Sequence, residues 1–183
     1  GAETFHYDGS VWAANVNSVQ AYTNTGATWG TQGSHVFAGG ATPPATSLVQ
    51  EYNTTAGAVT AAAWASGGNL NTARDEGASS QNGLQTAALY FGGYASDPAS
   101  NATEQYDGSS WTSKNNLNTA RYSGAGAGTT AAALYSGGFS NPSTLQSAVE
   151  EWDGTNWATQ PNSLSTARVN PGGCGIQTAA LVF

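Results

Sequence analysis

The stretch LNTARYSGAGAGTTAAALYSGG, residues 117–138, holds the pattern that decides the fold. Two similar stretches flank it: LNTARDEGASSQNGLQTAALYFGG at residues 70–93 and LSTARVNPGGCGIQTAALVF at residues 164–183. Each begins with a polar turn that contains an arginine, passes through glycine or small residues and ends in a small apolar run. A segment that occurs three times in 183 residues predicts an internally repeated fold.

Four series of positions give the length of the repeat, and they step along the chain together. They are the pairs Gly39-Gly40, Gly92-Gly93 and Gly137-Gly138; the tryptophans Trp12, Trp64, Trp111 and Trp157; the aromatics Tyr7, Tyr52, Tyr106 and Trp152; and the arginines Arg74, Arg121 and Arg168. The series divide the chain into four units of about 46 residues, which we expect to form one domain over residues 1–183. A wider gap between Tyr52 and Trp64 places a seven-residue insertion in the second unit.

Each unit is predicted to consist of short β-strands. QTAALYFGG is a small apolar run closed by two glycines, which suits a tightly packed strand. SAVEEWDGTNWATQ is two runs joined by Asp153-Gly154, a strong hairpin signal. No window shows a sustained helical period. Four strands in a repeat of 40–50 residues predict the blades of an all-β propeller.

The order of these features resembles the kelch repeat: a Gly-Gly pair, a variable loop, an aromatic near a turn, a tryptophan and then an arginine. This resemblance implies a β-propeller whose blades have four antiparallel strands each. The four units predict four blades, which is a small number for this family, whose rings more often have six or seven. The strand ending in Gly-Gly would be the second, and the aromatic and tryptophan series would mark the third and fourth. The sequence TEQYDGSSWTSKNNLNTARYSGAGAG also bears a more specific resemblance, to the Ala/Thr/Gly-rich kelch-like repeats in structural proteins of marine tailed phages, including cyanophages.

The two ends of the chain read as complementary halves of one unit. GAETFHYDGSVW resembles strands three and four, and CGIQTAALVF resembles strands one and two. We therefore expect both termini to share one blade and close a four-bladed ring, with the strand around Leu181 beside Phe5–Tyr7. The alternative is that these ends join neighbouring chains or further sequence; the chain has no Met, which favours a processed product or a piece of a longer protein.

Composition argues against several partners and chemistries. The net charge is -7 with only four Lys and Arg residues, so nucleic acid and anionic membranes are unfavourable partners. No run of about 18 apolar residues predicts a membrane span. His6 and His35 are the only histidines, and Cys174 is the only cysteine. These few residues argue against a hydrolytic triad, a zinc site and a copper-radical site of the kind that some kelch propellers carry. We expect no enzymatic activity, no cofactor and no metal, and we expect Cys174 to be a small buried residue.

Residues that repeat are predicted to be structural. Arg74, Arg121 and Arg168 are expected to hold the blades together by pairing with carboxylates such as Glu104 and Glu150. The first unit has Thr23 where the others have arginine. The repeated tryptophans are expected in the core, and they are Trp12, Trp64, Trp111 and Trp157.

Binding residues are sought where the units differ. Trp29, whose counterparts are read as Asn82, Ala127 and Cys174, is suited to stacking on a sugar, although packing in an irregular blade is the simpler interpretation. The loops after each Gly-Gly pair also diverge. Their candidate partner-binding residues are Tyr94, Asp97, Phe139 and Asn141, with plain solvated loops as the alternative.

The resemblance to phage repeats implies a non-enzymatic structural or adhesion module of a virion, such as a fibre, decoration or appendage protein. Its partners would be other virion proteins, a host-surface glycan or protein, or further copies of itself. The alternative is a secreted or cytosolic kelch domain of a cell that binds proteins or glycans. A propeller enzyme is the third and least favoured class.

Overall fold

The structure, a computed structural model, is all-β. It describes the backbone of residues 5–7, 12–14, 24–31, 34–41, 49–53, 63–95, 98–141 and 144–183, and side chains from residue 66 onward within these ranges. No α-helix occurs in these ranges, and a membrane-spanning helix is accordingly not found in them. The insertion predicted in the second unit, at residues 54–62, lies outside them.

The described ranges contain eighteen strands. They are β1 (Phe5–Tyr7), β2 (Trp12–Ala14), β3 (Asn24–Thr31), β4 (Ser34–Ala41), β5 (Val49–Asn53), β6 (Ala63–Ser66), β7 (Ala78–Ser79), β8 (Ala88–Phe91), β9 (Thr103–Tyr106), β10 (Trp111–Lys114), β11 (Ala125–Gly128), β12 (Ala133–Ser136), β13 (Phe139–Ser140), β14 (Thr144–Leu145), β15 (Val149–Trp152), β16 (Trp157–Thr159), β17 (Gly173–Ile176) and β18 (Ala179–Val182).

Twelve of the described strands form three four-stranded antiparallel sheets. The first sheet is β3-β4-β5-β6, the second is β7-β8-β9-β10, and the third is β11-β12-β15-β16. In the second sheet Gly92-Gly93 follow β8, the second strand, and Tyr106 pairs with Trp111 across the hairpin of strands three and four. The strand order is therefore the one that the repeat predicts.

Aspartate-glycine turns explain why the last two strands of a unit form a hairpin. In the second sheet the carboxylate of Asp107 accepts hydrogen bonds from the backbone N–H of Ser109 and of Ser110, at 2.9 Å each. Gly108 has a φ of 99°, a conformation that glycine adopts without steric cost. Asp153 and Gly154 repeat the same turn in the third sheet.

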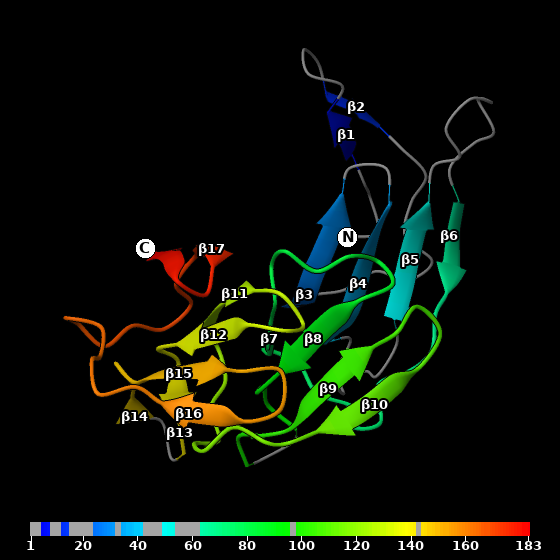
Figure 1. The fold of residues 1–183 in the computed structure, drawn as a ribbon. Helices are drawn as coiled ribbons and strands as arrows, with labels where there is room; N and C mark the ends of the chain where they lie inside the picture. Colours follow the sequence, from blue (N-terminus) through cyan, green and yellow to red (C-terminus); the bar gives the residue numbers. More distant parts are fainter. Residues whose placement is uncertain are drawn as a thin grey trace.

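The sheets lie side by side through their first strands. β3 contacts β7, β7 contacts β11, and β11 contacts β17. Figure 1 shows the sheets fanning outward from these strands, with the third and fourth strands of the second and third sheets on the outer side. Each four-stranded sheet is thus one repeat unit, and neighbouring units meet in sequence order.

Aromatic side chains fill the space between the second and third sheets. Phe91 lies 4.8 Å from Trp157 and 5.4 Å from Tyr135, measured between ring centroids. The indole nitrogen of Trp157 donates to Thr103 Oγ1 in the neighbouring sheet at 2.9 Å. Trp111 and Trp157 are each only 6% exposed, so both belong to the core as expected. The side chains of Trp12 and Trp64 lie outside the described part.

The two termini do not share a sheet in this structure. β1 pairs with β2 and β17 pairs with β18, as separate two-stranded sheets that Figure 1 shows far apart. The two segments also differ from a complete unit in sequence: Glu104 and Glu150 stand two residues before the aromatic of their units, whereas the N-terminal segment has Phe5 there. The N-terminal hairpin therefore lacks the carboxylate that an arginine of the repeat would require from its third strand.

Candidate functional site

The repeated arginines Arg74 and Arg121 lie in equivalent buried sites, which we call the arginine clasps. Arg74 forms an ion pair with Glu104 through Nη1 and Oε1, and neither side chain is appreciably exposed. Its Nε donates to the carbonyl of Gly92 at 3.0 Å. The guanidinium carbon lies 4.7 Å from the ring centroid of Tyr90, so the cation also contacts an aromatic face.

The clasp of Arg121 repeats this arrangement in the third sheet. Arg121 Nη2 lies 2.9 Å from Glu150 Oε1, and both side chains are fully buried. Nη1 donates to the carbonyls of Gly137 and Ala148 at 3.0 and 2.8 Å. The guanidinium carbon is 4.5 Å from the ring centroid of Tyr135. Burial raises the pKa of the Tyr135 hydroxyl above its ordinary value, so the ring is neutral beneath the cation.

Each clasp carboxylate also binds the backbone of the arginine segment. The N–H of Asn71 donates to Glu104 Oε2 at 2.7 Å, and the N–H of Asn118 donates to Glu150 Oε2 at 2.7 Å. A buried ion pair is stable only when such additional hydrogen bonds compensate for the loss of water. The first sheet has Gln50 at the register position of these glutamates and Thr23 in place of arginine, so both partners are replaced together.

The backbone of the arginine segment joins neighbouring units. Leu117 N–H donates to the carbonyl of Asn101 at 2.9 Å, and Gly93 N–H donates to the carbonyl of Arg121 at 2.9 Å. Gly138 N–H donates to the carbonyl of Arg168 at 2.7 Å in the same way. The segment therefore holds its own unit through side chains and the preceding unit through its backbone, which leaves the guanidinium groups of Arg74 and Arg121 inaccessible to a ligand.

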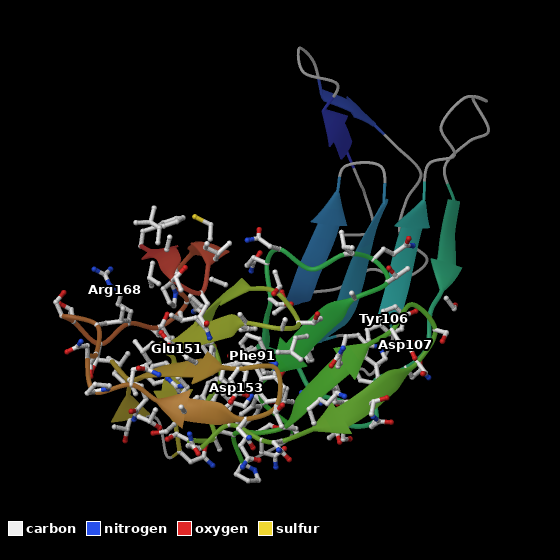
Figure 2. The ribbon with its side chains drawn as sticks, in the orientation of Figure 1. Phe91, Tyr106, Asp107, Glu151, Asp153 and Arg168 are labelled. Atoms are coloured by element: carbon white, nitrogen blue, oxygen red, sulfur yellow. The ribbon has the colours of Figure 1, made fainter. Side chains whose placement is uncertain are left out.

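Arg168 differs from the other two arginines. Its side chain is exposed, and no ion pair joins it to any described residue. Figure 2 shows it at the periphery, whereas Phe91 lies in the interior. The residue at the position of Tyr90 and Tyr135 is Val182, so the aromatic face is missing as well.

Cys174 on β17 is also exposed, contrary to the expectation of a buried side chain. Cys174 and Arg168 belong to the same unit, in which β17 and β18 form a two-stranded sheet; among the described residues no third or fourth strand completes it. Leu181 is 60% exposed there, while its counterpart Leu89 is fully buried.

A row of aromatic side chains lies where the loops after Gly-Gly meet the arginine segments. We call Tyr94, Tyr122 and Phe139 the aromatic row. The rings of Tyr94 and Tyr122 are 5.2 Å apart, and those of Tyr122 and Phe139 are 5.7 Å apart, between centroids. All three side chains are half-buried, so part of each remains open to solvent.

Backbone pairing fixes what lies at the two ends of the aromatic row. Asp75 and Tyr94 exchange hydrogen bonds of 3.0 and 2.8 Å, as an isolated antiparallel pair whose side chains point the same way. Asp75 Oδ1 is buried and has no hydrogen-bond partner. Burial raises the pKa of the Asp75 carboxyl, and the neighbouring charge of Glu76 raises it further. At the other end Phe139 pairs with Leu145, which is 48% exposed.

The structure brings together three of the sequence-predicted binding residues. Tyr94 and Phe139 belong to the aromatic row, and Asn141 connects their loops because its Oδ1 accepts from the N–H of Ala99 at 3.2 Å. Asp97 lies outside the described residues, and of Trp29 only the backbone is described, in β3 opposite Val36.

Sequence reasoning missed Asp75 and Tyr122. Both directly follow the repeated arginine, at a position where the third unit has Val169, and this difference between units was the available signal. The alignment of Trp29 with Asn82 was wrong by two residues. Ala127 pairs with Leu134 in the third sheet, and the residue that bonds to the equivalent Leu89 in the second sheet is Ser80. The counterpart of Trp29 in the second unit is therefore Ser80.

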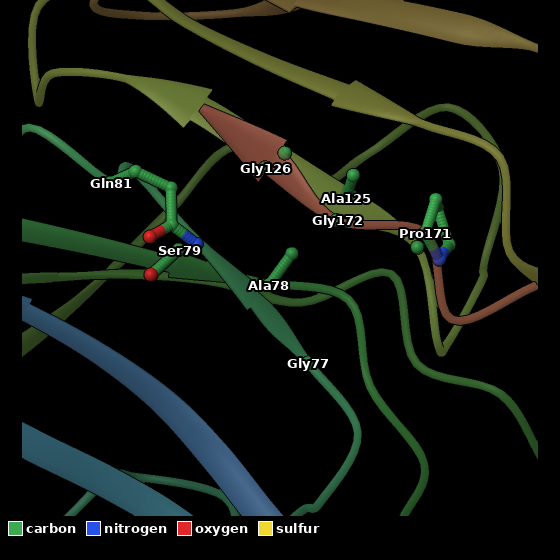
Figure 3. A pocket seen from close by; sticks show the side chains of 10 residues that line it. Gly77, Ala78, Ser79, Gln81, Ala125, Gly126, Pro171 and Gly172 are labelled. Carbon is green, nitrogen blue, oxygen red and sulfur yellow. The ribbon is translucent and has the colours of Figure 1, made fainter. Parts of the chain in front are cut away.

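A hollow with a volume of about 280 Å³ lies between β7, β11 and the segment that leads into β17 (Figure 3). Small and uncharged residues line it: Gly77, Ala78, Ser79, Gln81, Gly124, Ala125, Gly126, Pro171, Gly172 and Gly173. Within the described residues, no cluster of three His, Cys, Asp or Glu side chains is placed to hold a metal ion. The hollow therefore presents mainly backbone atoms, and the aromatic row offers the more specific chemistry.

Comparisons with known proteins identify the fold only. No protein-family model matches the sequence, and no curated protein shows significant similarity to it. Solved structures do match, in 148 chains, so this arrangement of strands is a recurrent one. One, described as "Structure of YjhT", is similar over 92% of this chain with a TM-score of 0.75 and 11% sequence identity. The match covers 60% of that structure, so this chain corresponds to about three fifths of its length.

Proposed function

We propose that the chain forms blades of a kelch-like β-propeller and serves as a non-enzymatic structural or adhesion module of a phage particle. The strand order of the sheets supports the propeller, as do the successive contacts of the first strands β3, β7, β11 and β17. A solved structure shares the fold over 92% of this chain, and the match covers 60% of that structure.

The observation that carries the binding role is the aromatic row. Repeated residues, such as the clasp arginines, are used to hold the units together, whereas Tyr94, Tyr122 and Phe139 occupy positions that vary between units. These three side chains remain partly open to solvent on a rigid antiparallel framework. Loops positioned by a rigid scaffold are the usual place for recognition, so this side of the molecule is the proposed attachment face.

The experiment is to find the chain in its particle. Phage particles purified from the source lysate are separated by density, and their proteins are identified by mass spectrometry. We expect the chain to co-purify with the particles at constant ratio to the major structural proteins. Antibody labelling in electron micrographs then places it on an exposed appendage or on the shell. Recovery only from the particle-free fraction would contradict the proposal and favour a cellular kelch domain.

A further inference from the structure

We propose that the exposed face of the β17–β18 hairpin binds a second copy of this chain. The second copy covers the face with its first sheet, β3-β4-β5-β6, and extends the hairpin with its own β1–β2 hairpin. Such a contact joins two different surfaces of the same chain, head to tail. It is separate from the proposed attachment face, because it uses no residue of the aromatic row.

The β17–β18 hairpin has one face that is open to solvent. Leu181 pairs with Cys174, and directly opposite residues of an antiparallel pair lie on the same face of the sheet. Phe183 stands two residues beyond Leu181 and shares that face. Leu181 is 60% exposed, Phe183 is 66% exposed, and Cys174 is exposed as well. The alternate residues of β18, Ala180 and Val182, are half-buried, so the open side is the one that carries the large apolar side chains.

The second sheet shows what normally covers this face. The counterparts of Leu181 and Phe183 are Leu89 and Phe91, and both are fully buried. They lie in one core cluster with three aromatic residues of the following unit, which we call the covering set: Tyr135, Trp152 and Trp157. The face that is open on the hairpin is therefore the one on which a following unit packs.

The first sheet has aromatic residues at the three register positions of the covering set. Tyr52 pairs with Trp64 across β5 and β6, and Phe37 stands two residues beyond the β4 partner of Tyr52. The covering set has the same register across β12, β15 and β16. Register fixes the face on which a position lies, so the first sheet of a second copy offers the surface that covers Phe91 between the second and third sheets.

The exposure of the hairpin points to another copy rather than to the same chain. Leu181 and Phe183 remain exposed although the chain that carries them also carries the first sheet. Among the described strands, β17 contacts β11 of the preceding unit. A second copy already has the aromatic spacing that fits this face, whereas an unrelated partner would have to reproduce it.

The β1–β2 hairpin of the second copy matches the strands that the β17–β18 hairpin lacks. Tyr7 pairs with Trp12 in it, as Tyr106 pairs with Trp111 on strands three and four of the second sheet. In sequence β1 and β2 directly precede the first sheet, so the second copy supplies the missing strands and the covering sheet in the order that the repeat requires.

The register of the second sheet also sets a compatible pair at this junction. There Tyr90 pairs with Glu104, and the corresponding residues of β18 and β1 are Val182 and Phe5. Two apolar residues thus replace the tyrosine and the glutamate of a clasp together. The junction requires no carboxylate, and the exposed Arg168 has no part in it.

The test follows the mass of the purified chain by sedimentation equilibrium and the reactivity of Cys174 with a maleimide, both as functions of concentration. Cys174 is the only cysteine of the sequence and lies on the open face. We expect the mean mass to rise above that of one chain, and Cys174 to become protected, as the concentration increases.

Two matched variants locate the contact. Leu181→Asp should weaken the association by about tenfold or more, because the contact would bury a carboxylate without a partner. Leu84→Asp, at a leucine that is 58% exposed in a complete unit, should leave the mass and the reactivity of Cys174 unchanged. Thermal unfolding of each variant verifies that it is folded. An amine-labelled Leu181→Asp chain should still sediment with an excess of the original chain, because its first sheet is intact.

Four results would overturn the inference. One is a single-chain mass at every concentration with Cys174 reactive. Another is a single-chain mass with Cys174 protected, which would mean that the chain covers its own hairpin. Equal effects of Leu181→Asp and Leu84→Asp would place the contact elsewhere. Rapid formation of a Cys174–Cys174 disulfide between associated chains would show that two hairpins meet face to face.

Discussion

The third sheet and the β17–β18 hairpin begin with nearly the same sequence and end in different environments. Both start from an arginine segment whose backbone bonds to the preceding unit, through Gly93 and Arg121 in one case and Gly138 and Arg168 in the other. Arg121 is nevertheless fully buried, and Arg168 is exposed. The arginine motif therefore fixes the backbone link between units, but it does not by itself create a clasp.

What the hairpin lacks is the third strand. In the third sheet β15 brings Glu150 to the guanidinium and covers β12, leaving Leu134 only 8% exposed. Its counterpart in the hairpin, Leu181, is 60% exposed. The burial of the inner strands therefore depends on a third strand that is distant in sequence. The stabilisation that the arginine provides depends on the same strand.

The largest expected effect comes from breaking a complete clasp. Glu150→Gln leaves the cation of Arg121 buried without its counter-charge, and we expect a loss of about 3 kcal/mol in the free energy of unfolding. Chemical denaturation followed by tryptophan fluorescence measures it, since Trp152 and Trp157 are neighbours of the site. Glu151→Gln is the matched control on the same strand, half-buried and outside the clasp, and it should change stability by less than about 0.5 kcal/mol. Equal effects of the two variants would contradict a clasp.

The second prediction compares the first glycine of two Gly-Gly pairs, each of which contacts the following arginine segment. Gly92 has a φ of 66°, and a Cβ there would lie 2.6 Å from the carbonyl oxygen of Arg121. Gly137 has a φ of 68°, with a corresponding distance of 2.9 Å to the carbonyl oxygen of Arg168. We expect Gly92→Ala to cost about 2 kcal/mol, because both the backbone strain and the clash must be accommodated by a clasped segment.

Gly137→Ala should cost only about 1 kcal/mol, since the segment it meets is held by backbone hydrogen bonds but lacks the buried ion pair that also holds the Arg121 segment. Thermal melts of both variants, converted at a common temperature, provide the measurement. A larger loss for Gly137→Ala would show that the link to the hairpin is the more rigid of the two.

A smaller effect tests whether the second and third sheets share their hairpin turns. Backbone N–H groups of Ser110 and Ser109 lower the pKa of Asp107 to about 2 from 3.8. A lowered carboxyl pKa means that the stabilisation is fully present above about pH 4 and is lost as the pH falls towards 2. Asp107→Asn should flatten the acid dependence of stability in that range, and Asp153→Asn should act in the same direction because the pKa of Asp153 is lowered too. A nuclear magnetic resonance titration that finds the usual pKa for Asp107 would refute the turn.

Much of the framework could be predicted from sequence, because it rests on local signals that repeat. Asp-Gly turns, the Gly-Gly closure and the Tyr106–Trp111 pairing all lie within one unit. They could be recognised because the same residues recur at the same positions in several units. The aromatic row could be predicted only in part. Tyr94 and Phe139 stand at visible loop starts, but Tyr122 and Asp75 join them through pairing between segments, and no periodicity reveals such a contact. The exposure of Cys174 was missed because burial depends on neighbouring strands rather than on the residue itself.

The smallest expected effect completes the comparison. Arg168→Ala removes an exposed cation that has neither a carboxylate partner nor an aromatic ring beneath it among the described residues. We expect a change of less than about 0.5 kcal/mol, as for an ordinary surface substitution, whereas Arg74→Ala should cost several times more because it leaves Glu104 buried and unpaired. Denaturant titrations of the two variants, made under the same conditions, give the ratio directly. If Arg168→Ala were as costly as Arg74→Ala, then Arg168 would be clasped in solution by a carboxylate from a strand that pairs with β18, and the hairpin would be part of a complete unit.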